Sequence, residues 1–311
     1  MTARARRRVE QVAGALAAVV AAAVALSVLA GVLSDGAWPW VVATYLRWSQ
    51  TLAITVATGV LIATRWWRTG LVAGLVAAGL IASIVAPLRA LTTVPAPDGE
   101  TLRIVVFNTG PGSGDVDAVA EAIAGARPDV AILLESEDIA ERLDRRLDGL
   151  ELLPTPTGSP VTAPPSVMAR RDWPLTVEPL DDGRPVSIVT AEIGGRPLDI
   201  VGMHPLPPVT RRWARSHDRS ISALTATVLP RSHPYVLACD CNTAPWTPSM
   251  RRLLDAGLRQ PTVAATFGAP LIGVPTDHVL LGSGVTAVSR ELGPFAGSDH
   301  RLIMTEVTLR S

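Results

Sequence analysis

The chain has 311 residues, of which 48% are hydrophobic and 18% charged, and its formal net charge is zero. This apolar content excludes intrinsic disorder, two cysteines are too few for a disulfide framework, and neutrality argues against a strongly basic nucleic-acid-binding protein. The charge is unevenly distributed, however. Residues 1–100 hold eight arginines and four acids, a net charge of +4, whereas residues 101–311 hold 20 arginines and 24 acids, a net charge of −4.

Apolar stretches at about residues 12–33, 40–64 and 71–88 predict three transmembrane helices. A helix of about 20 apolar residues is long enough to cross a bilayer. A cleaved signal peptide is the alternative for the first stretch, but its length and the further apolar stretches favour a membrane helix. We therefore expect a membrane domain at residues 1–91 and a short extended linker at residues 92–100.

Arginines mark one side of this membrane domain. They precede the first apolar stretch and occupy the second short loop, whereas the first loop, SDGAWPW, has none; the positions are Arg4, Arg6, Arg7, Arg8, Arg65 and Arg68. The positive-inside rule then places the N-terminus and the second loop in the cytoplasm. Three spans would leave residues 101–311 outside the cytoplasm, as part of a multi-pass protein of the cell membrane.

Residues 101–311 alternate short apolar runs, typical of strands, with helical stretches, which indicates an α/β domain. Two glycines, Gly194 and Gly195, separate two of the runs and indicate a hairpin. We expect strands at 102–108, 129–135, 186–193, 198–204, 235–242, 277–282 and 302–309, and helices at 116–126, 211–229 and 249–256.

Polar side chains stand where these predicted strands begin or end. A single one is usually a turn former, a helix cap or a surface group, but a whole series is harder to attribute to chance. Polar groups at one edge of a sheet can converge on a shared cleft. We predict such a cleft from Asn108, Glu135, His204, Asp240, Asn242, Asp277, Asp299 and His300.

The segments around these residues resemble the successive motifs of the endonuclease/exonuclease/phosphatase superfamily, which has the deoxyribonuclease I-like fold. They are, in order, LRIVVFN, PDVAILLE, GMHPLPP, ACDCNTAP, TDHVLL and GSDHRLI. The resemblance implies an α/β fold, a two-sheet sandwich flanked by helices, with a catalytic domain at residues 101–311. With apolar stretches in front, the chain is also similar to membrane-anchored bacterial members, including a group linked to teicoplanin resistance.

The resemblance also implies a divalent metal site. Glu135 would be the principal ligand, supported by Asn108 and Asp299. Oxygen ligands of this kind suit Mg²⁺, with Mn²⁺ as the alternative ion, and argue against zinc.

The catalytic groups follow from the same motifs. Asp240 would orient or deprotonate the attacking water, and Asn242 would hold a phosphoryl oxygen. His300 would stabilise charge on the phosphoryl group, with Asp277 holding its ring. His204 would bind the phosphate or protonate the leaving oxygen.

Arginines are candidate ligands of the substrate phosphate. Arg170 or Arg171, in ARRDWPL, would match an arginine motif of the family, and Arg211 begins a predicted helix rich in arginine. A solvated helix face is the alternative for Arg211.

Two cysteines and three further histidines have less specific surroundings. Cys239 and Cys241 are expected to pack as small apolar residues on the face opposite Asp240, because neighbours at i and i+2 on a strand are poorly placed for a disulfide. His278 is expected to point away from the site, and we expect His217 and His233 at the surface.

The sequence thus predicts a membrane-anchored, extracytoplasmic, divalent-metal-dependent phosphoesterase. The net charge of −4 on residues 101–311 disfavours nucleic acid, whose phosphates attract basic surfaces, so we expect a lipid-linked phosphoester or phosphodiester as substrate and the bilayer as partner. Two alternatives remain: an extracellular nuclease, and a non-catalytic ligand-binding membrane receptor that retains the fold.

Overall fold

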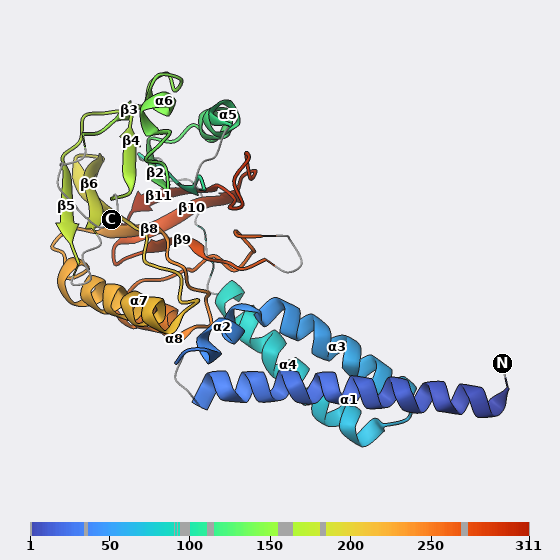
Figure 1. The fold of residues 1–311 in the computed structure, drawn as a ribbon. Coiled ribbons are helices and arrows are strands. Elements are labelled where there is room, and N and C mark those ends of the chain that lie inside the picture. Colours follow the sequence, from blue (N-terminus) through green and yellow to red (C-terminus); the bar gives the residue numbers. More distant parts are fainter. Residues whose placement is uncertain are drawn as a thin grey trace.

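A computed structural model of the chain shows a helical bundle joined to a two-sheet sandwich (Figure 1). It describes residues 2–33, 37–89, 91, 93, 100–110, 115–154, 164–180, 185–268 and 273–310. The predicted linker, 92–100, lies largely outside these residues; within it, Thr93 forms an isolated bridge with Ala287.

The bundle corrects the prediction of three transmembrane helices. Helices α1 (Ala3–Leu33) and α4 (Trp67–Arg89) each contain a stretch that is long and apolar enough to cross a membrane. The predicted span 40–64 is instead divided into α2 (Trp40–Tyr45) and α3 (Arg47–Ala63). The 17 residues of α3 extend about 26 Å, less than the hydrocarbon core of about 30 Å. Among the described helices, α1 and α4 alone meet the requirement.

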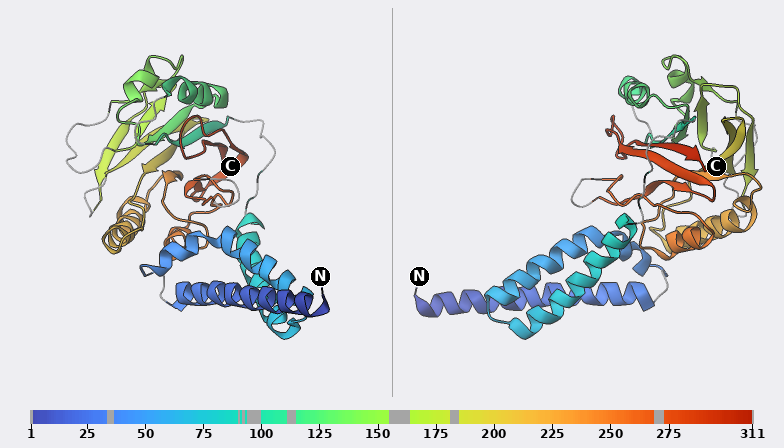
Figure 2. Two further views of the ribbon diagram at one scale, coloured as in Figure 1. Left: turned by 45° about the vertical axis from the view of Figure 1, so that its right-hand side comes forward. Right: turned by 180° about the vertical axis from the view of Figure 1, so that it is seen from behind.

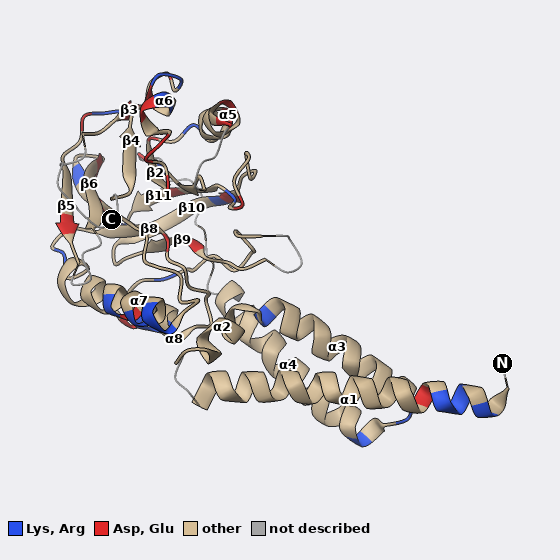
Figure 3. Cartoon of the chain, viewed as in Figure 1, with Lys and Arg blue, Asp and Glu red and all other residues tan. Residues whose placement is uncertain are grey.

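The chain runs along α1 toward the sandwich, returns along α3 and runs back along α4, so that α1 and α4 end on the same side (Figures 1 and 2). Their basic N-terminal ends lie at the same end of the bundle, where α1 projects beyond the start of α4 (Figure 3). Small and branched side chains such as Ala17, Ile54 and Leu80 are buried between the helices. The outward-facing positions are also apolar, as expected of a bundle surrounded by lipid.

Eleven strands build the sandwich. They are β1 (Leu102–Asn108), β2 (Val130–Leu134), β3 (Glu151–Leu152), β4 (Ser166–Ala169), β5 (Leu175–Pro179), β6 (Pro185–Ile193), β7 (Arg196–Met203), β8 (Tyr235–Asp240), β9 (Asp277–Leu281), β10 (Val285–Leu292) and β11 (Ile303–Leu309). One sheet has the order β10-β11-β1-β2-β4-β3 and the other β5-β6-β7-β8-β9. Only β1 with β2 and β7 with β8 pair in parallel among these described strands.

Helices cover the outer face of each sheet, which confirms the predicted sandwich with flanking helices. The first sheet packs against α5 (Val116–Ala126) and α6 (Ala140–Asp144). The second packs against α8 (Pro248–Asp255) and α7 (Arg211–Ala223), which continues into a π-helical turn at Leu224–Val228. Alternate residues of each strand face either these helices or the apolar layer between the sheets.

This alternation sends four predicted site residues toward the same edge of the sandwich. In β8, Val236 and Ala238 face the layer between the sheets, so Asp240 does too. Asn108, His204 and Asp277 have the same parity in or beside β1, β7 and β9. The strand pattern therefore brings residues more than 100 positions apart to one place.

Candidate active site

Asn108 links the two carboxylates of the site. Its Nδ2 donates to Oε1 of Glu135 at 3.1 Å and to Oδ2 of Asp240 at 3.0 Å. Its Oδ1 accepts from the backbone N–H of Gly110 at 3.0 Å, which fixes the orientation of the amide. The side chain is buried, so one amide at the end of β1 positions Glu135 and Asp240 relative to each other.

Glu135 reaches the site because the backbone turns after β2. Leu134 faces the layer between the sheets, so a continuing strand would direct residue 135 toward α5. Instead Glu135 has a φ of 52°, in the left-handed region that a non-glycine residue seldom adopts. Thr109 Oγ1 holds this turn by donating to the carbonyl of Glu135 at 3.0 Å. Strain of this kind is retained mainly where function requires it.

Asp240 is buried and charged. Its Oδ1 accepts from the backbone N–H of Asn242 at 3.0 Å, and its Oδ2 lies 3.5 Å from Nε2 of His204. Burial acts to raise the pKa of Asp240, but the hydrogen bond and charge of His204, the charge of His300 and the Asn242 N–H outweigh it and hold the pKa below its ordinary value. Asp240 is therefore a hydrogen-bond acceptor at neutral pH.

His300 forms a pair with Asp277. Nδ1 of His300 lies 2.9 Å from Oδ2 of Asp277, and its Nε2 lies 3.8 Å from Oδ2 of Asp240. Burial acts to lower the pKa of His300, but the hydrogen bond to Asp277 and the nearby carboxylate charges raise it to about 9. Thr276 donates to Asp277, and Thr266 Oγ1 accepts from the Asp277 N–H at 3.1 Å. This arrangement keeps an imidazolium in the site at neutral pH.

We expect Asp277→Asn to lower the alkaline limit, the pH above which catalytic activity is lost, because His300 would lose its proton at a lower pH. The pKa of His300 is about 9 in the folded protein, against an ordinary 6.5, so the imidazolium stabilises the fold fully below pH 6.5. This contribution to stability is lost as the pH rises through about 9. Without the carboxylate, the limit should fall toward 6.5 in a pH–rate profile. Asp255→Asn, in an exposed residue of α8, is the control. An unchanged alkaline limit in Asp277→Asn would contradict this assignment.

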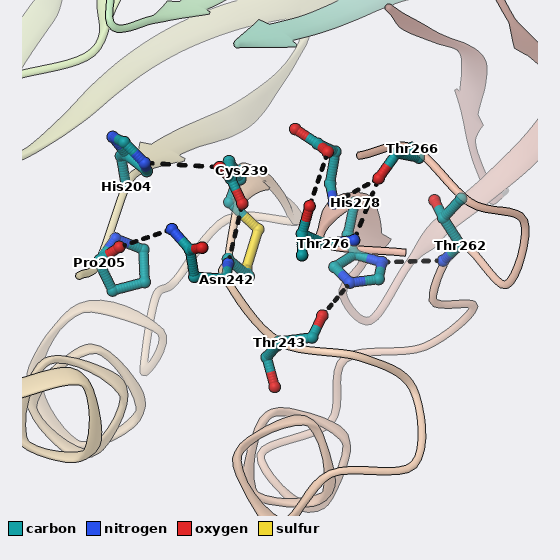
Figure 4. The surroundings of a disulfide bond; sticks show 12 residues. His204, Pro205, Cys239, Asn242, Thr243, Thr262, Thr266, Thr276 and His278 are labelled. Carbon is teal, nitrogen blue, oxygen red and sulfur yellow. Dashed lines mark hydrogen bonds and ion pairs between the residues drawn. A yellow bond between two sulfur atoms is a disulfide. The ribbon is translucent and has the colours of Figure 1, made fainter. Parts of the chain in front are cut away.

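Cys239 and Cys241 form a disulfide, so the prediction that they stay unpaired was wrong. Their Cα atoms are 4.9 Å apart, whereas residues at i and i+2 of a straight strand are separated by about 6.6 Å. The strand ends at Asp240 and Asn242 has a φ of 43°, so the chain bends and brings the two side chains together. Both face the buried layer beneath α7 and α8, on the side opposite Asp240 as expected (Figure 4).

The remaining histidines differ in their surroundings. His278 points away from the site as predicted: its Nδ1 accepts from the N–H of Thr262 and its Nε2 lies 2.8 Å from the carbonyl of Thr243 (Figure 4). His233 is exposed, also as predicted. The expectation that His217 lies at the surface was wrong, because it belongs to the buried face of α7, where its Nδ1 lies 3.0 Å from the carbonyl of Leu206.

The structure does not bring the candidate arginines into the site. Arg170 follows β4 at the end remote from Glu135, where its Nε donates to the carbonyl of Pro128 at 2.9 Å. Arg171 is exposed beside it. Arg211 occupies the exposed first turn of α7, near the site but outside the pocket lining.

The last motif is tied to the end of β1. Ser298 Oγ donates to the carbonyl of Asn108 at 2.8 Å and accepts from the N–H of His300 at 3.0 Å. Asp299 thereby lines the same pocket, and a Cβ at Gly110 would lie 3.4 Å from its Oδ1. Gly110 has a φ of 74°, so glycine suits both the turn and this close approach.

The donor set fits a divalent cation. Carboxylates and an amide oxygen are the ligands that Mg²⁺ and Mn²⁺ prefer. Ligand atoms of Asp240, Asp277 and His300 lie within 4.8 Å of one another, and Oδ1 of Asp277 is buried without a hydrogen-bond partner. Nδ1 of His300 is already bonded to Asp277, so within this trio Asp277 positions the imidazole.

A pocket of about 690 Å³ contains these groups. Among the predicted residues, its lining includes Glu135, His204, Asp240, Asn242, Asp299 and His300. Asn108 and Asp277 lie behind them as buried supports. The predicted residues therefore form one site, in which six side chains line the pocket and the buried side chains of Asn108 and Asp277 support them.

The helical bundle supplies part of the pocket wall, which the sequence reasoning missed. Val42, Tyr45 and Leu46 line the pocket opposite the catalytic edge. The Tyr45 hydroxyl donates to the carbonyl of Asn242, and Nε1 of Trp246 donates to the carbonyl of Thr44. Nothing local in the sequence of residues 40–46 shows which surface they contact.

A sandwich of this topology with carboxylates, an amide and two imidazoles at one edge defines a class of hydrolases that act on phosphate esters. Residues 107–300 match the Endonuclease/Exonuclease/phosphatase family, and the chain belongs to this family. The matched residues include every predicted metal-binding and catalytic residue, from Asn108 to His300.

Solved structures share the fold. An endonuclease/exonuclease/phosphatase from Beutenbergia cavernae is 19% identical, with a TM-score of 0.52 over 67% of this chain and 72% of that chain. Family proteins from Bacteroides thetaiotaomicron (12% identity, TM-score 0.56, covering 69% and 100%) and Bacteroides vulgatus (16%, 0.54, 68% and 100%) are also similar. No curated protein matches the sequence. The similarity to a membrane-anchored branch linked to teicoplanin resistance stays a prediction.

Proposed function

We propose that the protein is a membrane-anchored phosphoesterase that depends on Mg²⁺ or Mn²⁺, works outside the cytoplasm and hydrolyses a lipid-linked phosphoester. The observation that carries this proposal is the convergence of Glu135, Asp240 and His300 on one pocket, each with a bonded partner that sets its charge or orientation. A receptor that had lost catalysis would have no need to keep all three.

The geometry supports in-line attack of water on phosphorus. Asp240 would orient the water and accept its proton, while the imidazolium of His300 would bind a phosphoryl oxygen. Nδ2 of Asn242 donates one hydrogen to the carbonyl of Pro205 at 3.0 Å, and its second hydrogen would bind another phosphoryl oxygen. The ester P–O bond breaks, its electron pair leaves with the alcohol oxygen, and His204 would protonate that oxygen. The products are a phosphate group and an alcohol. Glu135 and Asp299 would hold the metal ion, with Asn108 positioning Glu135 rather than lining the pocket as predicted, and the ion would supply positive charge to the phosphoryl and leaving oxygens.

The course of the helices supports an extracytoplasmic site. Both candidate spans begin at the arginine-rich end of the bundle and end beside the sandwich (Figure 3). Under the positive-inside rule the arginine-rich end is cytoplasmic, and the catalytic domain is on the other side. This topology requires the shorter α3 to return the chain across the bilayer between α1 and α4, which local thinning of the bilayer allows. A disulfide at Cys239 and Cys241 agrees with an oxidising compartment.

Substrate class follows from charge and from the pocket wall. Residues 101–311 have a net charge of −4, which disfavours a long nucleic acid. Apolar residues from both the bundle and the sandwich line the pocket, which favours a phosphate attached to a hydrocarbon.

Full-length protein in detergent or nanodiscs, incubated with a generic phosphoester, tests the proposal. We expect hydrolysis with Mg²⁺ or Mn²⁺, its loss on chelation and a metal-dependent rise in melting temperature. A panel of polyprenyl pyrophosphate, phospholipids and DNA then compares substrates. Preference for DNA would favour the nuclease, and metal-dependent stabilisation without turnover of any ester would favour the receptor.

A further inference from the structure

We propose that the bundle builds the binding wall for the substrate's hydrocarbon, and that Val42 and Leu46 make the site selective for phosphate esters carrying a single long chain. This inference rests on the proposed phosphoesterase function and specifies its substrate. It assigns a substrate-binding role to membrane-domain residues in addition to anchoring.

Exposed apolar side chains are concentrated at this pocket. In the described part of residues 100–310, the large hydrophobic residues with high exposure are Val209, Trp213 and Phe267, and all three line the pocket. Their exposed fractions are 54%, 39% and 38%. Apolar residues that stay exposed together usually mark a surface that binds something apolar. Here they surround the opening of the catalytic site.

The bundle faces this rim with apolar residues of its own. Val42 and Leu46 line the pocket across from the catalytic edge, and Leu46 is 47% exposed. Leu46 joins α2 to α3, whose outward-facing Leu52 and Val56 are also exposed. A hydrocarbon lying against Leu46 can therefore continue along apolar surface toward the bilayer.

Hydrogen bonds hold the two halves of the pocket together. Besides the bonds of Tyr45 to Asn242 and of Trp246 to Thr44, Nε1 of Trp38 donates to the carbonyl of Val209 at 3.1 Å. These bonds join the bundle to the loop that follows Asp240 and to the rim itself. The wall is thus positioned relative to the reacting groups.

The position of the apolar lining selects the type of lipid. Pro205 and Leu206 follow His204 directly and line the pocket, so apolar surface begins beside the catalytic imidazole. A chain attached directly to the phosphate places its first carbons against this surface. A glycerophospholipid would instead put a polar glycerol ester there, where its oxygens would lose hydration. We therefore commit to a prenyl-type or alkyl phosphate.

The test compares farnesyl phosphate with dimethylallyl phosphate, which share the reacting group and differ in chain length. Wild-type full-length protein in nanodiscs should show higher kcat/KM for farnesyl phosphate. Val42→Ala/Leu46→Ala should lower kcat/KM for farnesyl phosphate more than that for dimethylallyl phosphate, so that the preference falls about tenfold, because apolar contact with the long chain is removed. Leu46→Trp, which fills the same wall, should also lower the rate with the long chain selectively.

Leu75→Ala is the matched control, because Leu75 is an exposed leucine of α4 outside the pocket and the variant experiences the same partition of substrate into lipid. Unchanged selectivity in Val42→Ala/Leu46→Ala would overturn the inference, as would faster hydrolysis of phosphatidic acid than of farnesyl phosphate. Titration of binding separates the two proposals. Tighter binding of farnesyl phosphate that depends on Val42 and Leu46, without turnover of either ester, would support the wall and overturn the phosphoesterase.

Discussion

Asp240→Asn should lower kcat for phosphoester hydrolysis by about 10³-fold, with little change in substrate binding. The carboxylate is buried and held ionised by His204 and His300, and it is the group placed to accept the proton of the attacking water. Asparagine has nearly the same shape, but it cannot accept that proton. Both carboxylate oxygens of Asp240 accept hydrogen bonds, so the NH₂ group of asparagine would have to face another donor, either Nδ2 of Asn108 or the N–H of Asn242.

Steady-state kinetics with a generic phosphoester, together with thermal melting, measures this effect. Asp218→Asn is the control, since Asp218 forms an exposed ion pair with Arg252 on the outer helices, and such pairs contribute little to stability. A folded Asp240→Asn protein that retains a tenth or more of wild-type kcat would show that Asp240 does not activate the water.

Glu135→Gln should abolish the response to the metal and lower hydrolysis by about 10³-fold at ordinary Mg²⁺ concentrations. Glu135 reaches the pocket through a strained turn and is part-exposed, as expected of a group that presents oxygen atoms to an ion. Glutamine can keep the hydrogen bond from Asn108 through its amide oxygen, so the fold should persist. The negative charge that attracts the cation is removed.

The measurement is the rise in melting temperature with Mg²⁺, which should be present in wild-type protein and absent in Glu135→Gln. Glu141→Gln, in an exposed residue of α6, should respond as wild type. If Glu135→Gln keeps the full metal-dependent rise, the cation is bound elsewhere, and the group of Asp240, Asp277 and His300 becomes the candidate centre.

Local patterns predicted most of the sandwich. The strand at 102–108 and the helix at 116–126 have the bounds of β1 and α5, because each is delimited by its own apolar period and by polar residues at its ends. Strands β3, β5 and β10 were not predicted. β3 has two residues, β5 has no buried residue, and the second half of β10 carries Ser289, Arg290 and Glu291, so none of the three shows a sustained apolar alternation. Strand β4 is four residues long, too short for a period to be recognised.

Within the site, parity along the strands was sufficient for Asn108, His204, Asp240 and Asp277, since side-chain direction in a strand is a local property. Glu135 was predicted from its position at the end of a strand, but parity alone directs it to the other face, and the left-handed turn at Glu135 brings it into the pocket. The disulfide between Cys239 and Cys241 depends on a bend after Asp240 that strand geometry does not foresee.

The sequence by itself determined that an apolar, arginine-flanked segment precedes a domain with a phosphoesterase constellation, because composition and strand-end chemistry are local. The tertiary structure decided what surrounds that constellation. It divided the second apolar stretch at Leu46 and placed Val42, Tyr45 and Leu46 in the pocket. It also held Arg170 at the far end of β2. These outcomes depend on contacts between residues up to about 200 positions apart, such as Tyr45 with Asn242, and no local pattern encodes such contacts.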